Sequence, residues 1–197
     1  MKQILQYLKN GMTVVEDVPV PEVKLGSVLV QTACSLVSAG TERMVVDFAA
    51  KSLIGKAAAR PDLVRQVINK AMREGVISSV EAAFNKIDQP MPLGYSSAGT
   101  VVEVAEDVTD FKPGDRVACA GGGYAVHAEY TLVPINLLAK LPENVGFEPA
   151  AFTTLGAIAL HGFRLAAPQI GERVCIIGMG LLGLLSAQIA RAAGCTV

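Results

Sequence analysis

The chain has 197 residues, of which 51% are hydrophobic and 18% are charged, and 17 Lys and Arg nearly balance 18 Asp and Glu to a formal net charge of −1. This is enough apolar material for one large core or two small ones. A near-neutral chain without a basic cluster at a terminus lacks the electrostatic attraction on which nucleic-acid binding depends. We therefore expect no nucleic-acid partner.

The cysteines and the hydropathy pattern indicate the compartment. Four cysteines, at positions 34, 119, 175 and 195, form no Cys-x-x-Cys pair, and a chain of this size does not need disulfides to be stable. We expect reduced thiols in the cytoplasm, with Cys34, Cys175 and Cys195 as small core residues. The first ten residues do not resemble a signal peptide, and the longest uncharged stretch, residues 174–190, is interrupted by three glycines. No membrane segment is predicted.

The first part of the chain has the pattern of a β domain. Residues 1–10 predict a first strand, and residues 12–36 predict further short strands around the Pro and Gly positions. Strand patterns return at residues 99–105, 116–119 and 128–133, again separated by Gly and Pro turns. Residues 1–147 therefore predict one mainly β domain.

A different pattern interrupts this domain. Apolar residues recur at helical spacing over residues 63–72, and Ser78 with Glu81 has the form of a capping box that begins a second short helix. We therefore expect a helical insertion at about residues 42–90.

The composition changes again after residue 147. An Ala-rich, uncharged segment within residues 148–164 predicts a buried helix, and the sequence RVCII at residues 173–177 predicts a buried parallel strand. The sequence GMGLLG at residues 178–183 follows directly, and a helical pattern then continues from near Leu181 to a closing Gly194. A strand, a Gly-x-Gly-x-x-Gly turn and a helix together are the dinucleotide-binding fingerprint.

Each glycine of the fingerprint has its own expected role. Gly178 makes the tight turn, Gly180 lets a pyrophosphate approach the backbone, and Gly183 lets the helix and the strand pack closely. The anion would lie against the amide groups at the start of the helix, at Leu181 and Leu182. The alternative is a glycine turn between core elements with no ligand.

The whole chain resembles the medium-chain dehydrogenases/reductases, the zinc-type alcohol dehydrogenase-like superfamily. The resemblance is carried by GYSSAGTVVEV at residues 94–104, VTDFKPGDRV at 108–117 and AEYTLVP at 128–134. It implies a mainly β GroES-like domain with the helical insertion, over residues 1–147. The crossover helix and the first β-α unit of an α/β Rossmann domain would then follow, over residues 148–197. It also implies NAD or NADP as cofactor and hydride transfer to or from a small-molecule substrate.

The chain departs from the zinc enzymes of this family at the ligand positions. The position of their first ligand, a cysteine, is occupied by Ala39, or by Val37 or Ser38 in another alignment register. The second ligand position is occupied by Tyr95, and the third lies near Thr153. None of these residues is a thiol or an imidazole, and zinc needs several such ligands converging on one point. The four-cysteine structural zinc lobe is also missing from the sequence. We therefore expect no zinc, with Thr153 lining the substrate cleft.

Hydroxyl groups are then the chemistry available at these positions. Thr41 lies where the family carries a Ser or Thr proton relay, and the phenol of Tyr95 would donate a hydrogen bond to a substrate oxygen. The alternatives are that Thr41 caps a helix starting at Glu42 and that Tyr95 fills the space a metal would take. Of the two histidines, His161 is expected at the core or its boundary and His127 on a loop rim.

The sequence SAGTER at residues 38–43 and the long connection from Ala39 to Tyr95 resemble a zinc-less bacterial subgroup in which a second oxidoreductase part follows. A sugar or nucleotide-sugar substrate would follow by analogy. Because a dinucleotide domain has about six parallel strands, we expect the chain to be the N-terminal, inactive fragment of a longer enzyme. It would either self-associate through residues 170–197, as a symmetric dimer, or leave that segment disordered.

Two other classes of function stay open from the sequence. The chain could be a non-catalytic module that kept the fold and binds a dinucleotide or a partner, or a β domain whose main role is assembly.

Overall fold

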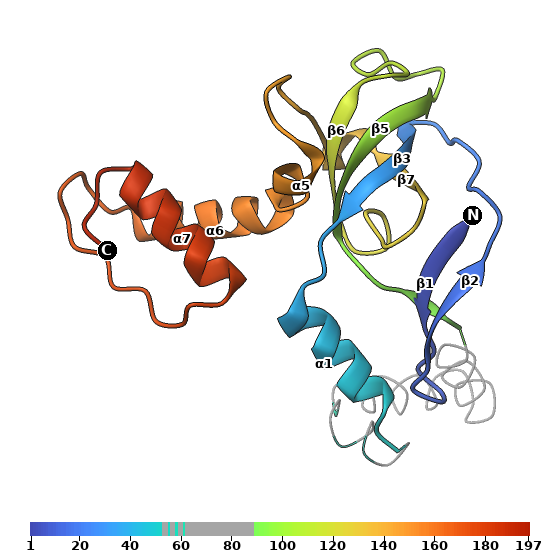
Figure 1. The fold of residues 1–197 in the computed structure, drawn as a ribbon, viewed down its shortest axis with the longest axis horizontal. Coiled ribbons are helices and arrows are strands. Elements are labelled where there is room, and N and C mark those ends of the chain that lie inside the picture. The colour runs from blue at the N-terminus through green and yellow to red at the C-terminus, as the bar shows by residue number, and fades with distance from the viewer. Residues whose placement is uncertain (53–54, 56–57, 59–60, 62–88) are drawn as a thin grey trace, which may run out of the picture. The chain divides into compact units, whose positions relative to one another are not determined.

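The computed structural model describes residues 1–52, 55, 58, 61 and 89–197. The chain forms two compact units (Figure 1). The first unit consists of Met1–Pro19 and Val37–Leu93, and the second of Val20–Leu36 and Gly94–Val197. Each is described by itself below. The helix predicted over residues 63–72 and the capping box at Ser78 lie outside the described residues.

The first unit contains a small antiparallel sheet and a helix. The sheet has the strand order β2-β1-β4, with β1 at Lys2–Gln6, β2 at Thr13–Asp17 and β4 at Met91–Pro92. The predicted first strand is thus confirmed by β1. The helix α1 covers Ala39–Ala49, so it begins three residues before the predicted insertion and continues into it.

The second unit contains an antiparallel sheet of five strands in the order β7-β3-β5-β6-β8. Their bounds are Ser27–Ser35 for β3, Ser96–Val104 for β5, Arg116–Ala120 for β6, Tyr130–Pro134 for β7 and Leu138–Lys140 for β8, with a short 3₁₀ helix η1 at Ile135–Leu137. These strands confirm the predictions for residues 99–105, 116–119 and 128–133.

The core of this sheet consists of small and branched apolar side chains. Its fully buried members are Val28, Val30, Val101, Val117, Cys119, Ala125 and Val133. They come from β3, β5, β6, β7 and the loop before β7, so the core spans the sheet. β-Branched residues suit such a pleated and buried surface.

The structure has two helices in the region where the sequence predicted one, over residues 148–164. They are α5 at Phe147–Ala150 and α6 at Thr153–Ala166. The hydroxyl of Thr153 donates to the Ala150 carbonyl over 2.6 Å, and the hydroxyl of Ser96 donates to the Ala151 carbonyl over 2.6 Å. These side chains bond carbonyls that a continuous helix would offer to its own amides, so the helix is interrupted there.

The predicted strand over residues 173–177 is not a regular strand. Only one parallel bridge, between Arg173 and Thr196, ties it to the C-terminal residues. Ile177 is 97% exposed and Cys175 is exposed. A strand needs a ladder of partners, and in the described part of the chain Thr196 alone pairs here, so the expectation of a buried strand and of Cys175 as a core residue was wrong.

The last helix, α7, covers Leu181–Ala192 and packs against α6 (Figure 1). Gly194 follows it with φ +84°, the left-handed conformation that commonly ends a helix. The predicted helix and its closing glycine are therefore confirmed. Within the described residues, no helix is both long enough and apolar enough to cross a membrane.

Candidate functional site

The glycine turn before α7 has a distinct geometry at each glycine. Gly178 has φ +98°, a conformation that residues with a side chain rarely adopt. A Cβ added to Gly183 would lie 1.9 Å from the carbonyl oxygen of Gly178, whereas a Cβ added to Gly180 would meet no atom within 4 Å. Gly178 and Gly183 therefore allow a tight, closely packed turn, and Gly180 faces open space.

The open space lies at the start of α7. Gly180 is the N-cap residue, and its carbonyl accepts the amide of Leu184 over 2.9 Å as the first bond of the helix. The amides of Leu181, Leu182 and Gly183 precede that bond, so they are the groups that a helix offers to an anion. No acidic residue lies in the first turn to compete for them. This cradle fits the pyrophosphate of a dinucleotide.

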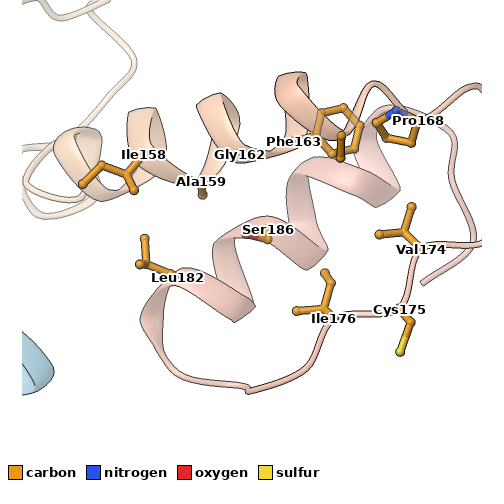
Figure 2. Close-up of a pocket in the computed structure, with 11 residues that line it drawn as sticks. Ile158, Ala159, Gly162, Phe163, Pro168, Val174, Cys175, Ile176, Leu182 and Ser186 are labelled. Atoms are coloured by element: carbon orange, nitrogen blue, oxygen red, sulfur yellow. The ribbon is translucent and has the colours of Figure 1, made fainter.

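A cavity of about 370 Å³ lies beside this turn, between α6, α7 and the segment before the glycines (Figure 2). Its lining is almost entirely apolar and includes Ile158 and Phe163 from α6, Ile176, and Leu182 from α7; Ser186 supplies a hydroxyl. Such a lining offers few groups to hydrogen-bond a phosphate. The cavity therefore offers a phosphate little, and the proposed anion cradle lies at the turn itself.

Tyr95 lies in a backbone segment that is held on several sides. Its carbonyl accepts the amide of Gly121 over 3.0 Å and lies 3.5 Å from the hydroxyl of Thr154. The next residue, Ser96, is buried and bonded to Ala151 through its hydroxyl. Tyr95 itself is half-buried. The structure thus brings Tyr95 next to the beginning of α6, where Thr153 also lies.

Thr153 and Thr41 both lie exposed at the start of a helix. Thr153 is exposed, and its hydroxyl is used by the Ala150 carbonyl. Helix α1 begins at Ala39 with Ser38 as its N-cap, so Thr41 is an exposed residue of the first turn and does not cap the helix. Instead the Glu42 carboxylate accepts the amide of Ser38 over 2.8 Å, which satisfies one amide of that helix end. The expected Thr41 cap was therefore wrong.

The two histidines lie in environments opposite to those expected: His161 is exposed and His127 is buried. His161 lies exposed on α6, whereas His127 is only 6% exposed and bonds the Ser35 hydroxyl through Nδ1 over 2.8 Å. Both expectations were wrong, because the family strand begins at Tyr130 and leaves His127 in a buried turn. No sequence pattern marked the His127–Ser35 pair, since its members are 92 residues apart.

The cysteines differ in their burial. Burial raises the pKa of Cys119 to about 12, so its thiol stays protonated at neutral pH. Cys195 is also buried, as predicted, and Cys34 is half-buried. In the part of the chain that the structure describes, no three His, Cys, Asp or Glu residues cluster as a metal site would require.

Part of the chain is similar in sequence to known dehydrogenases. Residues 63–143 match the alcohol dehydrogenase GroES-like domain. Sorbitol dehydrogenase 1 of Saccharomyces cerevisiae is 34% identical over 134 residues, which cover 54% of this chain and 38% of that protein. The chain thus spans well under half the length of this curated relative. These sequence matches are to alcohol dehydrogenase-like proteins and cover only part of this chain.

Solved structures share the fold over the whole chain. The galactitol-1-phosphate dehydrogenase from Escherichia coli has a TM-score of 0.72 at 23% identity and covers 99% of this chain and 54% of its own. A putative zinc-binding dehydrogenase from Sinorhizobium meliloti 1021, bound to NADP, has a TM-score of 0.68 at 22% identity and covers 100% of this chain and 54% of its own. The predicted fold class, a GroES-like domain followed by the beginning of a Rossmann domain, is confirmed.

Proposed function

We propose that this chain is part of a zinc-independent oxidoreductase that transfers hydride between NAD or NADP and a small alcohol or carbonyl substrate. The glycine turn carries the proposal. Gly180 leaves room at the start of α7, and Gly183 is required by its approach to Gly178. A plain packing turn would need Gly178 and Gly183 but would not need an open position at Gly180.

The residues of the turn would hold the cofactor. The amides of Leu181, Leu182 and Gly183 would bind the pyrophosphate, with Gly178 and Gly180 shaping the approach. The bound nicotinamide supplies the hydride or accepts it. The NADP-bound neighbour supports this assignment through its fold alone.

The absence of zinc is proposed from residue types. The positions of the family ligands hold Ala39, Tyr95 and Thr153, none of which is a usual zinc ligand. Ala39 offers no donor atom, and the Thr153 hydroxyl donates to Ala150. The residues present do not fit a catalytic zinc.

We assign the catalytic roles to two hydroxyl groups. In alcohol oxidation the substrate loses a hydride from carbon to the cofactor and a proton from oxygen. The Tyr95 phenol would hydrogen-bond that oxygen. Thr41 is proposed separately, from its position in the sequence, as a hydroxyl that passes a proton to solvent. Thr153 would line the substrate cleft. Thr41 belongs to the first unit and Tyr95 to the second.

Polyols and sugars are the substrate class we propose. The curated relative acts on sorbitol and the structural neighbour on galactitol 1-phosphate, as their names state. Sugars and nucleotide-sugars are the related candidates. The protein would work in the cytoplasm, with a GroES-like domain at residues 1–147 and the Rossmann part from residue 148.

Tyr95→Phe tests the function and the phenol together. In the full-length protein we expect hydride transfer with NAD or NADP on at least one of sorbitol and galactitol 1-phosphate. Removal of the phenol should lower kcat by about a hundredfold, within the usual range for a proton-donating group, with nucleotide affinity unchanged. Steady-state kinetics followed by nicotinamide absorbance measure both.

The matched control is Tyr124→Phe, because Tyr124 is 45% exposed and is assigned no role. Undiminished turnover of Tyr95→Phe would remove the phenol from the proposal. Nucleotide binding without turnover on any oxidoreductase substrate would favour the non-catalytic dinucleotide-binding module.

We also propose that residues 170–197 associate with a second copy when the 197-residue chain is produced by itself. Ile170 is 87% exposed and Ile177 is 97% exposed, and the segment before the glycine turn has one bridge partner. Apolar side chains and an unpaired edge favour association. Light scattering over a dilution series should show a dimer, the commonest closed assembly. A monomer at high concentration whose residues 170–197 resist protease would contradict this.

A further inference from the structure

His127 occupies a buried position that the proposed chemistry does not use. Its side chain is 6% exposed, and its Nδ1 lies 2.8 Å from the Ser35 hydroxyl at the end of β3. A histidine this deeply buried is held in one orientation by its hydrogen bond. The ring is therefore a fixed element of the second unit.

The ring and backbone of His127 lie against Gly94. A Cβ added to Gly94 would lie 2.8 Å from the His127 amide nitrogen and 3.0 Å from its Nδ1. Gly94 also has φ +96°, so this position excludes a side chain on two independent grounds. The histidine thus packs directly on the peptide that leads into Tyr95.

The other hydrogen bonds of this segment are made by backbone groups that follow the Tyr95 Cα in the chain. The Tyr95 carbonyl accepts the Gly121 amide over 3.0 Å, and the Ser96 carbonyl accepts the Leu36 amide over 2.9 Å. These bonds hold the backbone on the C-terminal side of the Tyr95 Cα. The contact between Gly94 and His127 holds it on the N-terminal side. The backbone on both sides of a Cα sets the direction of its Cα–Cβ bond and limits the rotamers that the side chain can adopt.

From this geometry we propose that His127, held by Ser35, is the positioning residue that fixes the Tyr95 phenol for catalysis. The inference rests on the proposed role of Tyr95. His127 itself does not touch the substrate. His127 acts by holding Gly94 in place. Substitutions of His127 that keep a hydrogen-bonding group at the Nδ1 position should therefore keep Tyr95 in its position.

The test follows the Tyr95 ring directly, in full-length protein labelled with ¹³C-tyrosine and assigned with Tyr95→Phe. His127→Leu fills the volume but removes the bond to Ser35, and should shift the Tyr95 ring resonances. It should also speed amide exchange at Gly121 at least tenfold relative to Gly114, whose amide bonds Val101 elsewhere in the sheet. His127→Asn should restore both, because its amide group lies close to the Nδ1 position.

His161→Leu is the matched control, since this histidine is exposed on α6. If His127→Leu does not fold, Ser35→Ala should give the same changes in the same direction. Unchanged Tyr95 resonances, or exchange that rises equally at Gly121 and Gly114, would overturn the positioning role.

Turnover on the substrates named above separates this inference from the proposed function. If Tyr95→Phe loses kcat, His127→Leu should lower kcat at unchanged KM, with no further loss in the Tyr95→Phe background. Additive losses in the two variants would refute positioning through Tyr95 while leaving the catalytic phenol intact. Full activity of Tyr95→Phe would instead refute the catalytic phenol, and the inference with it.

Discussion

Gly180→Val in the full-length protein should abolish NAD and NADP binding while leaving the fold intact. The structure has no atom within 4 Å of a Cβ at this position, so the protein itself tolerates the side chain. The branched side chain would instead occupy the space proposed for the pyrophosphate. Loss of hydrogen bonds to a charged group costs about 1.5–3 kcal/mol each, so we expect affinity to fall by a hundredfold or more.

Titration of NADPH by its fluorescence, together with thermal unfolding, measures both parts of this prediction. Gly183→Ala is the informative comparison, because its Cβ would lie 1.9 Å from the Gly178 carbonyl oxygen and must move the turn. That variant should lose stability as well as binding. A folded Gly180→Val variant with unchanged affinity would show that the glycine turn only packs the helix.

Gly99→Ala should cause the largest loss of stability among single-methyl substitutions in the sheet. Gly99 lies on the central strand β5, and a Cβ there would lie 2.1 Å from the Gln31 carbonyl oxygen on β3. The obstacle is backbone within the paired strands, so it cannot rotate away. We expect the free energy of unfolding to fall by about 3 kcal/mol or more, the upper range for overpacking.

Urea unfolding of the full-length protein, read from the transition of this domain, measures the change. Gly122→Ala is the matched control, because Gly122 has no atom within 4 Å of its Cβ and no positive φ. Its stability should change by less than about 0.5 kcal/mol. Equal stability of the two variants would mean that β3 and β5 do not approach each other this closely.

The sequence predicted the elements whose pattern is local. The strands β1, β2, β3, β5, β6 and β7 follow alternating apolar residues and Gly or Pro turns, and α7 follows its glycine turn and ends before Gly194. These features depend on residues close together in the chain. They could be predicted because short-range periodicity and turn chemistry determine them.

What the sequence did not predict depends on contacts between distant residues. The break between α5 and α6 involves Ser96, and the burial of His127 involves Ser35 and Gly94. The segment before the glycine turn was predicted as a strand from its composition, but pairing partners decide whether a strand forms. The start of α1 at Ala39 is a local exception, missed because Glu42, rather than a hydroxyl, accepts the amide of the N-cap residue Ser38.

The measurement that tests the central claim most directly is hydride transfer by the full-length protein after prolonged dialysis against a strong chelator, with zinc determined by elemental analysis. The account predicts no stoichiometric zinc and undiminished NAD- or NADP-dependent turnover, because Ala39, Tyr95 and Thr153 stand at the family's ligand positions. About one tightly held zinc per chain, with turnover lost on chelation and restored by added zinc, would contradict it.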